Sequence, residues 1–155
     1  MTHMKKNILV VDDSALMRRV MCDIINSDSK FQATDYCRDG LEAYEKLKHT
    51  SYDGVVLDVN MPRMDGLQLL EKLQKEGIRA NVVMVSTLTD SREADVTILA
   101  MERGAIDFVA KPTNIIEAKG EAFKRQLLGV LNAVLATQKQ QEVSVWQQNR
   151  QQRHR

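Results

Sequence analysis

Short apolar segments rich in β-branched residues alternate along the chain with segments whose apolar residues recur at helical spacing. The short segments predict five strands, at residues 8–11, 31–37, 55–57, 82–85 and 106–110. The first, third and fourth are apolar throughout, which is typical of interior strands covered on both faces of a parallel sheet. The pattern therefore predicts a parallel sheet whose strands alternate with helices.

Helical periodicity marks one segment after each predicted strand. The second predicted helix begins at Asp39-Gly40, the third ends at Gly77, and the fourth ends at Gly104. The apolar residues at this spacing are Met17, Val20, Met21, Ile24 and Ile25 in the first helix, Leu41, Tyr44 and Leu47 in the second, Leu67, Leu70 and Leu73 in the third, Ala94, Ile98 and Met101 in the fourth, and Phe123, Leu127, Val130, Leu131 and Val134 in the last and longest.

Five strand–helix units predict an α/β fold of the flavodoxin-like kind, a doubly wound parallel sheet with strand order 2-1-3-4-5. We assign this domain to residues 1–138. Residues 139–155 are glutamine-rich and basic and lack apolar periodicity, which indicates a solvated tail or the start of an interdomain linker. A small docking patch around Trp146 is the less favoured alternative for this segment.

Length, composition and charge narrow the class of protein. A chain of 155 residues, 43% apolar and 28% charged, suits one globular domain. The net charge of +1 gives no electrostatic basis for binding nucleic acid or an anionic membrane. The apolar runs are far shorter than the ~20 residues that cross a bilayer. Cys22 and Cys37 lack metal-type spacing and are expected to be buried free thiols in a cytoplasmic protein.

Polar residues follow the predicted strands at the sheet edge where α/β proteins bind their ligands. They are Asp12 and Asp13, Asp58, Ser86 and Thr87, and Lys111. Taken singly, Asp13 could cap the helix that starts at Ser14, and Asp58 could open a turn. Three carboxylates together with one amine at a single edge point instead to a binding site.

The three carboxylates would repel one another unless a cation lay between them. Magnesium prefers oxygen ligands in octahedral geometry and is usually held by one or two carboxylates. Asp13 and Asp58 are suited to bind Mg²⁺ directly, and Asp12 directly or through water. The backbone carbonyl of Asn60 is a further candidate ligand.

A carboxylate can also act as a nucleophile and form an aspartyl phosphate. Asp58 is our candidate for this role, with the Lys111 ammonium neutralising phosphoryl charge and a hydroxyl from the fourth strand donating a hydrogen bond. Neighbouring strand residues face opposite sides, so only one of Ser86 and Thr87 meets the phosphate. We choose Ser86 because it directly ends the strand, and keep Thr87 as the alternative.

Four motifs, read together, resemble the receiver domains of two-component response regulators over residues 5–138. They are Val10-Val-Asp-Asp-Ser14, Leu57-Asp-Val-Asn-Met-Pro-Arg-Met-Asp-Gly66, Val85-Ser86 and Lys111-Pro112.

The resemblance implies roles for individual residues. Asp12 and Asp13 would bind magnesium, Asp58 would accept phosphate, and Ser86 would be the switch hydroxyl. Phe108 would be the switch aromatic, and Lys111 would sense the phosphate. From the residues alone, an aromatic side chain in a strand such as Phe108 is more often part of the core.

The resemblance also implies a mode of action. A histidine kinase would donate the phosphoryl group. The face formed by the fourth predicted helix, the fifth strand and the fifth and last predicted helix would bind an output domain or partner protein. A cis peptide bond between Lys111 and Pro112 is a further implication.

A narrower resemblance concerns residues 13–19, 83–89 and 104–113, together with the insertion at 114–120. These segments are similar to the receiver half of chemotaxis protein-glutamate methylesterases, which implies a hydrolase output domain beyond a linker. The chain stops at Arg155, within the expected linker, and no glycine-flanked nucleophilic serine is present, so we expect no esterase activity from this chain itself.

Two other functions remain as alternatives. One is a free-standing single-domain response regulator that acts by binding a partner protein. The other is a magnesium-dependent phosphatase with Asp58 as nucleophile, which is disfavoured because Asn60 cannot act as a general acid. DNA binding is disfavoured by the near-neutral charge and the lack of a second helical domain.

Asn60 yields a prediction about phosphoryl lifetime. Methylesterase receivers often carry an acidic residue at this position, whereas asparagine leaves room for a water molecule to attack the acyl phosphate. We expect fairly rapid self-dephosphorylation and a longer phosphoryl lifetime in Asn60→Glu, measured as decay of labelled protein after the phosphodonor is removed. A shorter lifetime in the variant would contradict the prediction.

Overall fold

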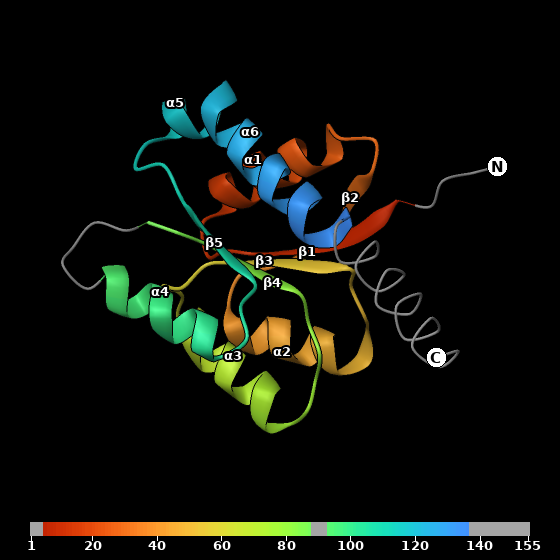
Figure 1. Ribbon diagram of the computed structural model, residues 1–155, viewed down its shortest axis with the longest axis vertical. Helices are drawn as coiled ribbons and strands as arrows, with labels where there is room; N and C mark the ends of the chain where they lie inside the picture. The colour runs from red at the N-terminus through yellow and green to blue at the C-terminus, as the bar shows by residue number, and fades with distance from the viewer. Residues whose placement is uncertain (1–4, 88–92, 137–155) are drawn as a thin grey trace, which may run out of the picture.

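The computed structural model describes residues 5–87 and 93–136, which form a parallel sheet with helices on both faces (Figure 1). The five strands lie in the order β2-β1-β3-β4-β5, which confirms the predicted topology. Their bounds are Lys6–Val11 for β1, Phe31–Cys37 for β2, Gly54–Leu57 for β3, Val82–Ser86 for β4 and Asp107–Ala110 for β5.

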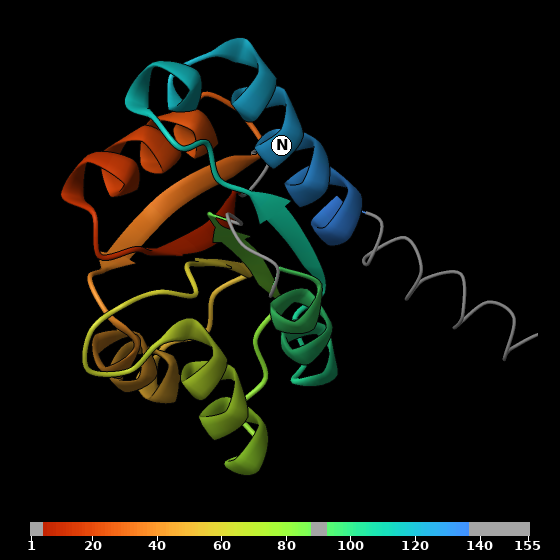
Figure 2. The same ribbon diagram turned by 90° about the vertical axis from the view of Figure 1, so that its left-hand side faces the viewer.

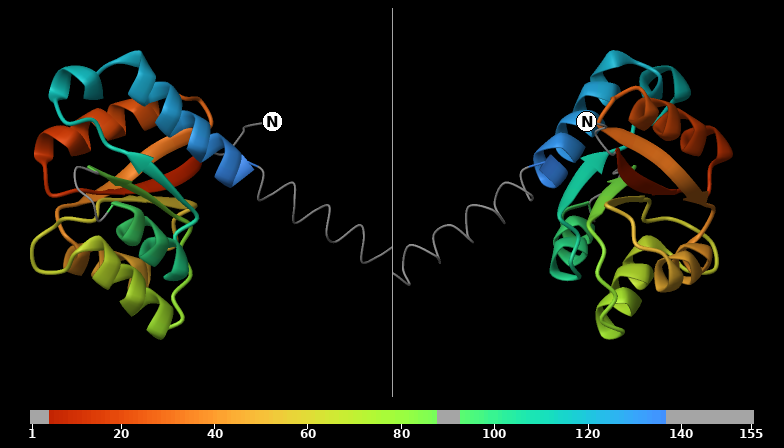
Figure 3. Two further views of the ribbon diagram at one scale, coloured as in Figure 1. Left: turned by 60° about the vertical axis from the view of Figure 1, so that its left-hand side comes forward. Right: turned by 90° about the vertical axis from the view of Figure 1, so that its right-hand side faces the viewer.

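The helices divide into two layers in all the views (Figures 1, 2 and 3). One face of the sheet carries α1, α5 and α6, and the other carries α2, α3 and α4. Their bounds are Ala15–Asn26 for α1, Gly40–His49 for α2, Gly66–Lys75 for α3, Glu93–Glu102 for α4, Ile115–Ala118 for α5 and Glu121–Leu131 for α6, which continues into a π-helical turn, η1, at Asn132–Ala136.

The central strand β1 explains why the interior strands are apolar throughout. Its side chains alternate between two cores, because successive strand residues point to opposite faces. Ile8 and Val10 pack into the core under α1 and α6, whereas Leu9 and Val11 pack into the core above α2 and α3. All four are fully buried, so neither face of the strand meets water over residues 8–11.

In α4, the apolar residues that marked the helix in the sequence are on its exposed side. Ala94, Ile98 and Met101, which marked this helix in the sequence, lie on its exposed side, with Ile98 56% and Met101 43% accessible. The side that packs against the sheet carries Val96 and the fully buried Ala100. Apolar residues occur on both sides of α4, so their spacing alone did not identify the buried one.

The structure also describes three smaller features of the chain. The insertion at 114–120 forms the one-turn helix α5, whose N-cap is Asn114. No cis peptide bond occurs among residues 5–87 and 93–136, so the expectation of a cis bond between Lys111 and Pro112 is wrong. The cis and trans forms of a bond before proline differ by only about 0.5–1 kcal/mol, so the residue types alone do not determine which form is present. Both cysteines are free, but only Cys37 is buried, and Cys22 on α1 is partly exposed.

The predicted tail at 139–155, with Trp146, lies outside the described residues. Within the described part of the chain, no helix is both long and apolar enough to cross a membrane.

An ion pair on the outer strand β2 ties this edge of the sheet to α2. The Asp35 carboxylate accepts hydrogen bonds from the Lys46 ammonium at 3.0 Å and from the Tyr52 hydroxyl at 2.9 Å. Partial burial alone would raise the pKa of Asp35, but these bonds and one from the Tyr36 backbone outweigh it and lower the pKa. Burial and the same carboxylate raise the pKa of Tyr52 to about 12.

This lowered pKa predicts a pH-dependent contribution to stability. A carboxyl whose folded pKa is depressed stabilises the fold above its unfolded pKa of 3.8 and loses that contribution as the pH falls through the folded value. Asp35→Asn should therefore lower the free energy of unfolding by about 1 kcal/mol at neutral pH.

The difference between wild type and Asp35→Asn should shrink below pH 3.8, as measured by urea unfolding along a pH series. Asp23→Asn is the matched control, because Asp23 is exposed and its ion pair with Arg19, at 3.9 Å, lies on the surface. A difference that stays constant down to pH 3 would show that the Asp35 charge does not carry the effect.

Candidate functional site

Four strands deliver polar side chains to one point at the carboxyl edge of the sheet. Asp12 follows β1, Asp58 follows β3, Ser86 ends β4 and Lys111 follows β5. Because the strands are parallel, their carboxyl ends meet at the same edge. The structure thus brings together four of the residues that the sequence singled out.

Asp58 lies at the centre of this group and is almost fully buried. The Ser86 hydroxyl donates to its Oδ1 at 2.9 Å, and the Lys111 ammonium donates to its Oδ2 at 3.1 Å. Both oxygens of the carboxylate are therefore held, one by the end of β4 and the other by the residue that follows β5. The hydrogen bonds come from Ser86 and Lys111 rather than from a turn at Met61-Pro62, so the simple turn-opening role considered for Asp58 does not account for its position.

Asp12 shares the same lysine. Its Oδ2 accepts from the Lys111 ammonium at 2.7 Å, and its Oδ1 accepts from the Ser14 backbone at 2.9 Å. Burial raises the pKa of Asp12, the nearby Asp58 carboxylate raises it further, and Lys111 only partly opposes them. Burial alone would lower the pKa of Lys111, but the two carboxylates outweigh this effect and raise it.

Asp13 completes a cluster of three acids. Asp12, Asp13 and Asp58 each place a carboxylate oxygen within 4.8 Å of the others, and Asp13 is exposed while its two companions are buried. The α1 helix is capped by the Ser14 hydroxyl, which accepts from the Met17 backbone, so the alternative of Asp13 as helix cap is wrong.

The donor set fits a magnesium ion. It consists of oxygen atoms only, it carries three negative charges against the single positive charge of Lys111, and it opens to solvent on the Asp13 side. A hard divalent cation that retains several water ligands matches all three properties. Asn60, the source of the predicted carbonyl ligand, lies exposed in the loop between β3 and α3.

The fourth strand favours one of its two candidate hydroxyls. Ser86 is buried and bonded to Asp58, whereas Thr87 is partly exposed just beyond the end of β4. Phe108 on β5 is partly buried and packs against the core that contains Ala100 of α4, as does the partly buried Val96 of α4. Its place between core and surface is compatible with either role that was considered for it.

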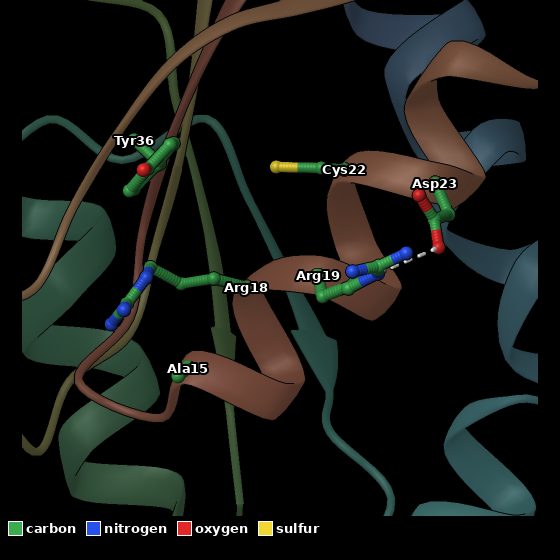
Figure 4. Close-up of a pocket in the computed structure, with 6 residues that line it drawn as sticks. All are labelled: Ala15, Arg18, Arg19, Cys22, Asp23 and Tyr36. Carbon is green, nitrogen blue, oxygen red and sulfur yellow. Dashed lines mark ion pairs between the residues drawn. The ribbon is translucent and has the colours of Figure 1, made fainter.

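Sequence reasoning missed two arginines that contact the loops of the site. Arg18 donates to the Asp12 backbone carbonyl at 2.8 Å, and its guanidinium lies 5.6 Å from the centre of the Tyr36 ring. Figure 4 shows Arg18 and Tyr36 on one side of a groove between α1 and β2, with Cys22 and the Arg19–Asp23 pair on the other. Arg18 lies four residues after the helix cap Ser14, and nothing else in the sequence indicated that it would contact the site.

The second missed arginine is Arg63, in the loop between β3 and α3. Its guanidinium binds the Asp39 carboxylate at the start of α2. Its backbone has a φ of 65°, which is uncommon for any residue other than glycine. Nothing in the spacing of Asp39 and Arg63 indicated that they would meet.

Comparisons with known proteins agree with this geometry. A family model described as the response regulator receiver domain matches residues 8–120. Protein-glutamate methylesterase/protein-glutamine glutaminase of Pyrococcus horikoshii is 45% identical over 124 residues, covering 80% of this chain and 33% of that protein. The protein of the same name from Escherichia coli K12 is 50% identical over 109 residues, covering 70% of this chain and 30% of that protein.

Solved structures give the same result. The response regulator domain of Thermotoga maritima CheB has a TM-score of 0.74 and 34% identity, covering 86% of this chain and 98% of that one. A chain in the CheX–CheY–BeF3–Mg complex of Borrelia burgdorferi has a TM-score of 0.62 and 30% identity, covering 76% and 89%. The chain spans about a third of the length of the methylesterase relatives it matches. On this sequence and structural similarity, the chain belongs to the response regulator receiver domain family, with methylesterase receivers among its relatives.

Proposed function

We propose that this domain accepts a phosphoryl group from a histidine kinase onto Asp58, with Mg²⁺ bound beside it, and thereby regulates an output. The observation that carries the proposal is the arrangement around the Asp58 carboxylate. One of its oxygens is held by Ser86 and the other by Lys111. A carboxylate oxygen from each of Asp12 and Asp13 lies within 4.8 Å of an oxygen of Asp58.

The residues suggest how the transfer proceeds. An Asp58 oxygen attacks the phosphorus atom as the phosphorus–nitrogen bond to the donor imidazole breaks, and the departing ring keeps the bond's electron pair and takes a proton. Lys111 and Ser86, which now bind Asp58, are close enough to turn to the phosphoryl oxygens. Magnesium held by Asp12, Asp13, Asp58 and the Asn60 carbonyl would neutralise phosphoryl charge.

The same contacts supply a route from the phosphate to the surface. If the Ser86 hydroxyl leaves Asp58 for a phosphoryl oxygen, the end of β4 moves with it. Phe108 of β5 and Val96 of α4 both pack against the same core, so repacking there would change the position of α4. The exposed Ile98 and Met101 of α4, together with β5 and α6, form our proposed surface for an output domain or partner protein.

The output itself is proposed from the relatives. Because the similar curated proteins are methylesterases about three times as long as the aligned segment, we propose that the natural protein regulates a methylesterase domain. A free-standing receiver that binds a separate partner is the alternative. A reading frame that stops at codon 155 would favour the alternative and contradict the methylesterase proposal.

Phosphorylation gives the direct test. Incubation with acetyl phosphate and Mg²⁺ should add one phosphoryl group, detected by intact-protein mass spectrometry and located at Asp58. Asp58→Asn should lose the label, because an amide oxygen is a poor nucleophile. In the phosphorylated wild type, backbone NMR signals of β4, α4 and β5 should shift.

Asp95→Asn is the control, since Asp95 is an exposed acid on α4 outside the cluster, and it should be labelled like the wild type. A label on another residue, or continuous turnover of phosphate esters, would contradict the receiver function. Labelling at Asp58 without any shift in α4 would contradict the proposed output surface.

Magnesium binding can be tested without phosphorylation. A ligand that binds only the folded state raises the free energy of unfolding, by roughly 1.4 kcal/mol when its free concentration is about ten times Kd. Mg²⁺ should stabilise the wild type in this way, and Asp13→Asn should lose most of the effect because it removes one of the three carboxylates. Urea unfolding with Mg²⁺ or with EDTA measures both, and equal stabilisation of the variant would exclude Asp13 as a ligand.

A further inference from the structure

The ion pair between Asp39 and Arg63 joins the loop beside the acidic cluster to the second helix layer. Resting on the proposed function, we propose that Arg63 is a positioning residue for Mg²⁺. The pair holds the loop between β3 and α3 so that the Asn60 carbonyl faces the three carboxylates. Arg63 itself does not touch the ion in this proposal, and acts through the loop backbone.

The pair has well-defined geometry. The Arg63 Nε and Nη2 atoms both donate to Asp39 Oδ2, at 2.9 and 2.6 Å, while Asp39 Oδ1 accepts from the Glu42 backbone and caps α2. Burial alone would raise the pKa of Asp39, but these bonds outweigh it and lower the pKa, so the carboxylate is charged at neutral pH. Because α2 fixes the carboxylate, the guanidinium bound to it is fixed as well.

The loop backbone is held next to the same point. The Gly40 backbone donates to the Met64 carbonyl at 2.9 Å, and a Cβ atom at Gly40 would lie 2.3 Å from that oxygen. Only glycine allows this approach. Arg63 has a φ of 65°, so the chain turns sharply between the ion pair and the Gly40 contact.

The far end of the loop is bonded to Val59 and packs against the backbone of Asp58. The Gly66 backbone donates to the Val59 carbonyl at 2.8 Å, and a Cβ atom at Gly66 would lie 2.2 Å from the Asp58 carbonyl. Asn60 lies between this attachment and Arg63. A displacement of Arg63 would therefore move the short segment between Val59 and Arg63, which contains Asn60 and its predicted carbonyl ligand.

Apolar burial contributes little to holding this segment. Asn60, Pro62 and Arg63 are exposed, and Met61 is only partly buried. An ion pair with a half-exposed partner adds little to global stability, but two donors to one oxygen restrict orientation. The pair is thus suited to orienting the loop rather than to stabilising the fold.

The test separates the side chain from its backbone. Arg63→Asn removes the guanidinium but keeps a residue that readily adopts positive φ. Asp39→Asn removes the charge but keeps a good helix cap. Each should weaken Mg²⁺ binding to the unphosphorylated protein about tenfold by calorimetry, as loss of an outer partner of a metal site does. Arg63→Lys should weaken Mg²⁺ binding less than Arg63→Asn does.

Two further measurements distinguish positioning from a structural role. The double variant should bind Mg²⁺ no more weakly than either single variant, because both remove the same contact. The Mg²⁺ concentration for half-maximal phosphorylation should rise by the same factor, while the rate at saturating Mg²⁺ stays within about twofold of wild type.

Lys75→Asn is the matched control. It breaks an exposed ion pair of 3.0 Å with Glu71 on α3, away from the site, and should leave Mg²⁺ affinity unchanged. The proposal is overturned if Arg63→Asn and Asp39→Asn bind Mg²⁺ like the wild type, even where their free energy of unfolding falls. If the wild type binds no Mg²⁺, that result contradicts the proposed function itself rather than the role of Arg63 alone.

Discussion

The shared ammonium group of Lys111 is the interaction on which the site depends. It lies 2.7 Å from an oxygen of Asp12 and 3.1 Å from an oxygen of Asp58, and all three side chains are at least nine-tenths buried. Removing charged groups from water costs several kcal/mol each unless they are paired with good geometry. The sheet meets this requirement by placing the amine and the acids on strands that end at one edge.

The same arrangement leaves an excess of negative charge. One lysine cannot balance the carboxylates of Asp12, Asp13 and Asp58. Burial, and after it the nearby Asp58 carboxylate, raises the pKa of Asp12. A divalent cation would remove the imbalance, and a phosphoryl group would then bring negative charge back toward Lys111 and Ser86. The unphosphorylated geometry therefore already contains both of the groups that a phosphate would recruit.

The sequence predicted those features that follow from local pattern and strand direction. Apolar runs located the strands, and parallel strands necessarily bring Asp12, Asp58, Ser86 and Lys111 to one edge. It did not predict contacts that depend on how helices pack. The exposed side of α4, the partial exposure of Cys22 and the meeting of Asp39 with Arg63 are set by tertiary structure, which residue spacing does not encode.

The distance along the chain between the members of the site has a consequence for synthesis of the protein. Lys111 is 99 residues from Asp12 and 53 from Asp58, so the amine leaves the ribosome last. A nascent chain that exposes only the first three strands has its acids without their counter-charge, and like charges oppose their close approach. The ion pairs of Lys111 with Asp12 and Asp58 can therefore form only after the fifth strand has been synthesised.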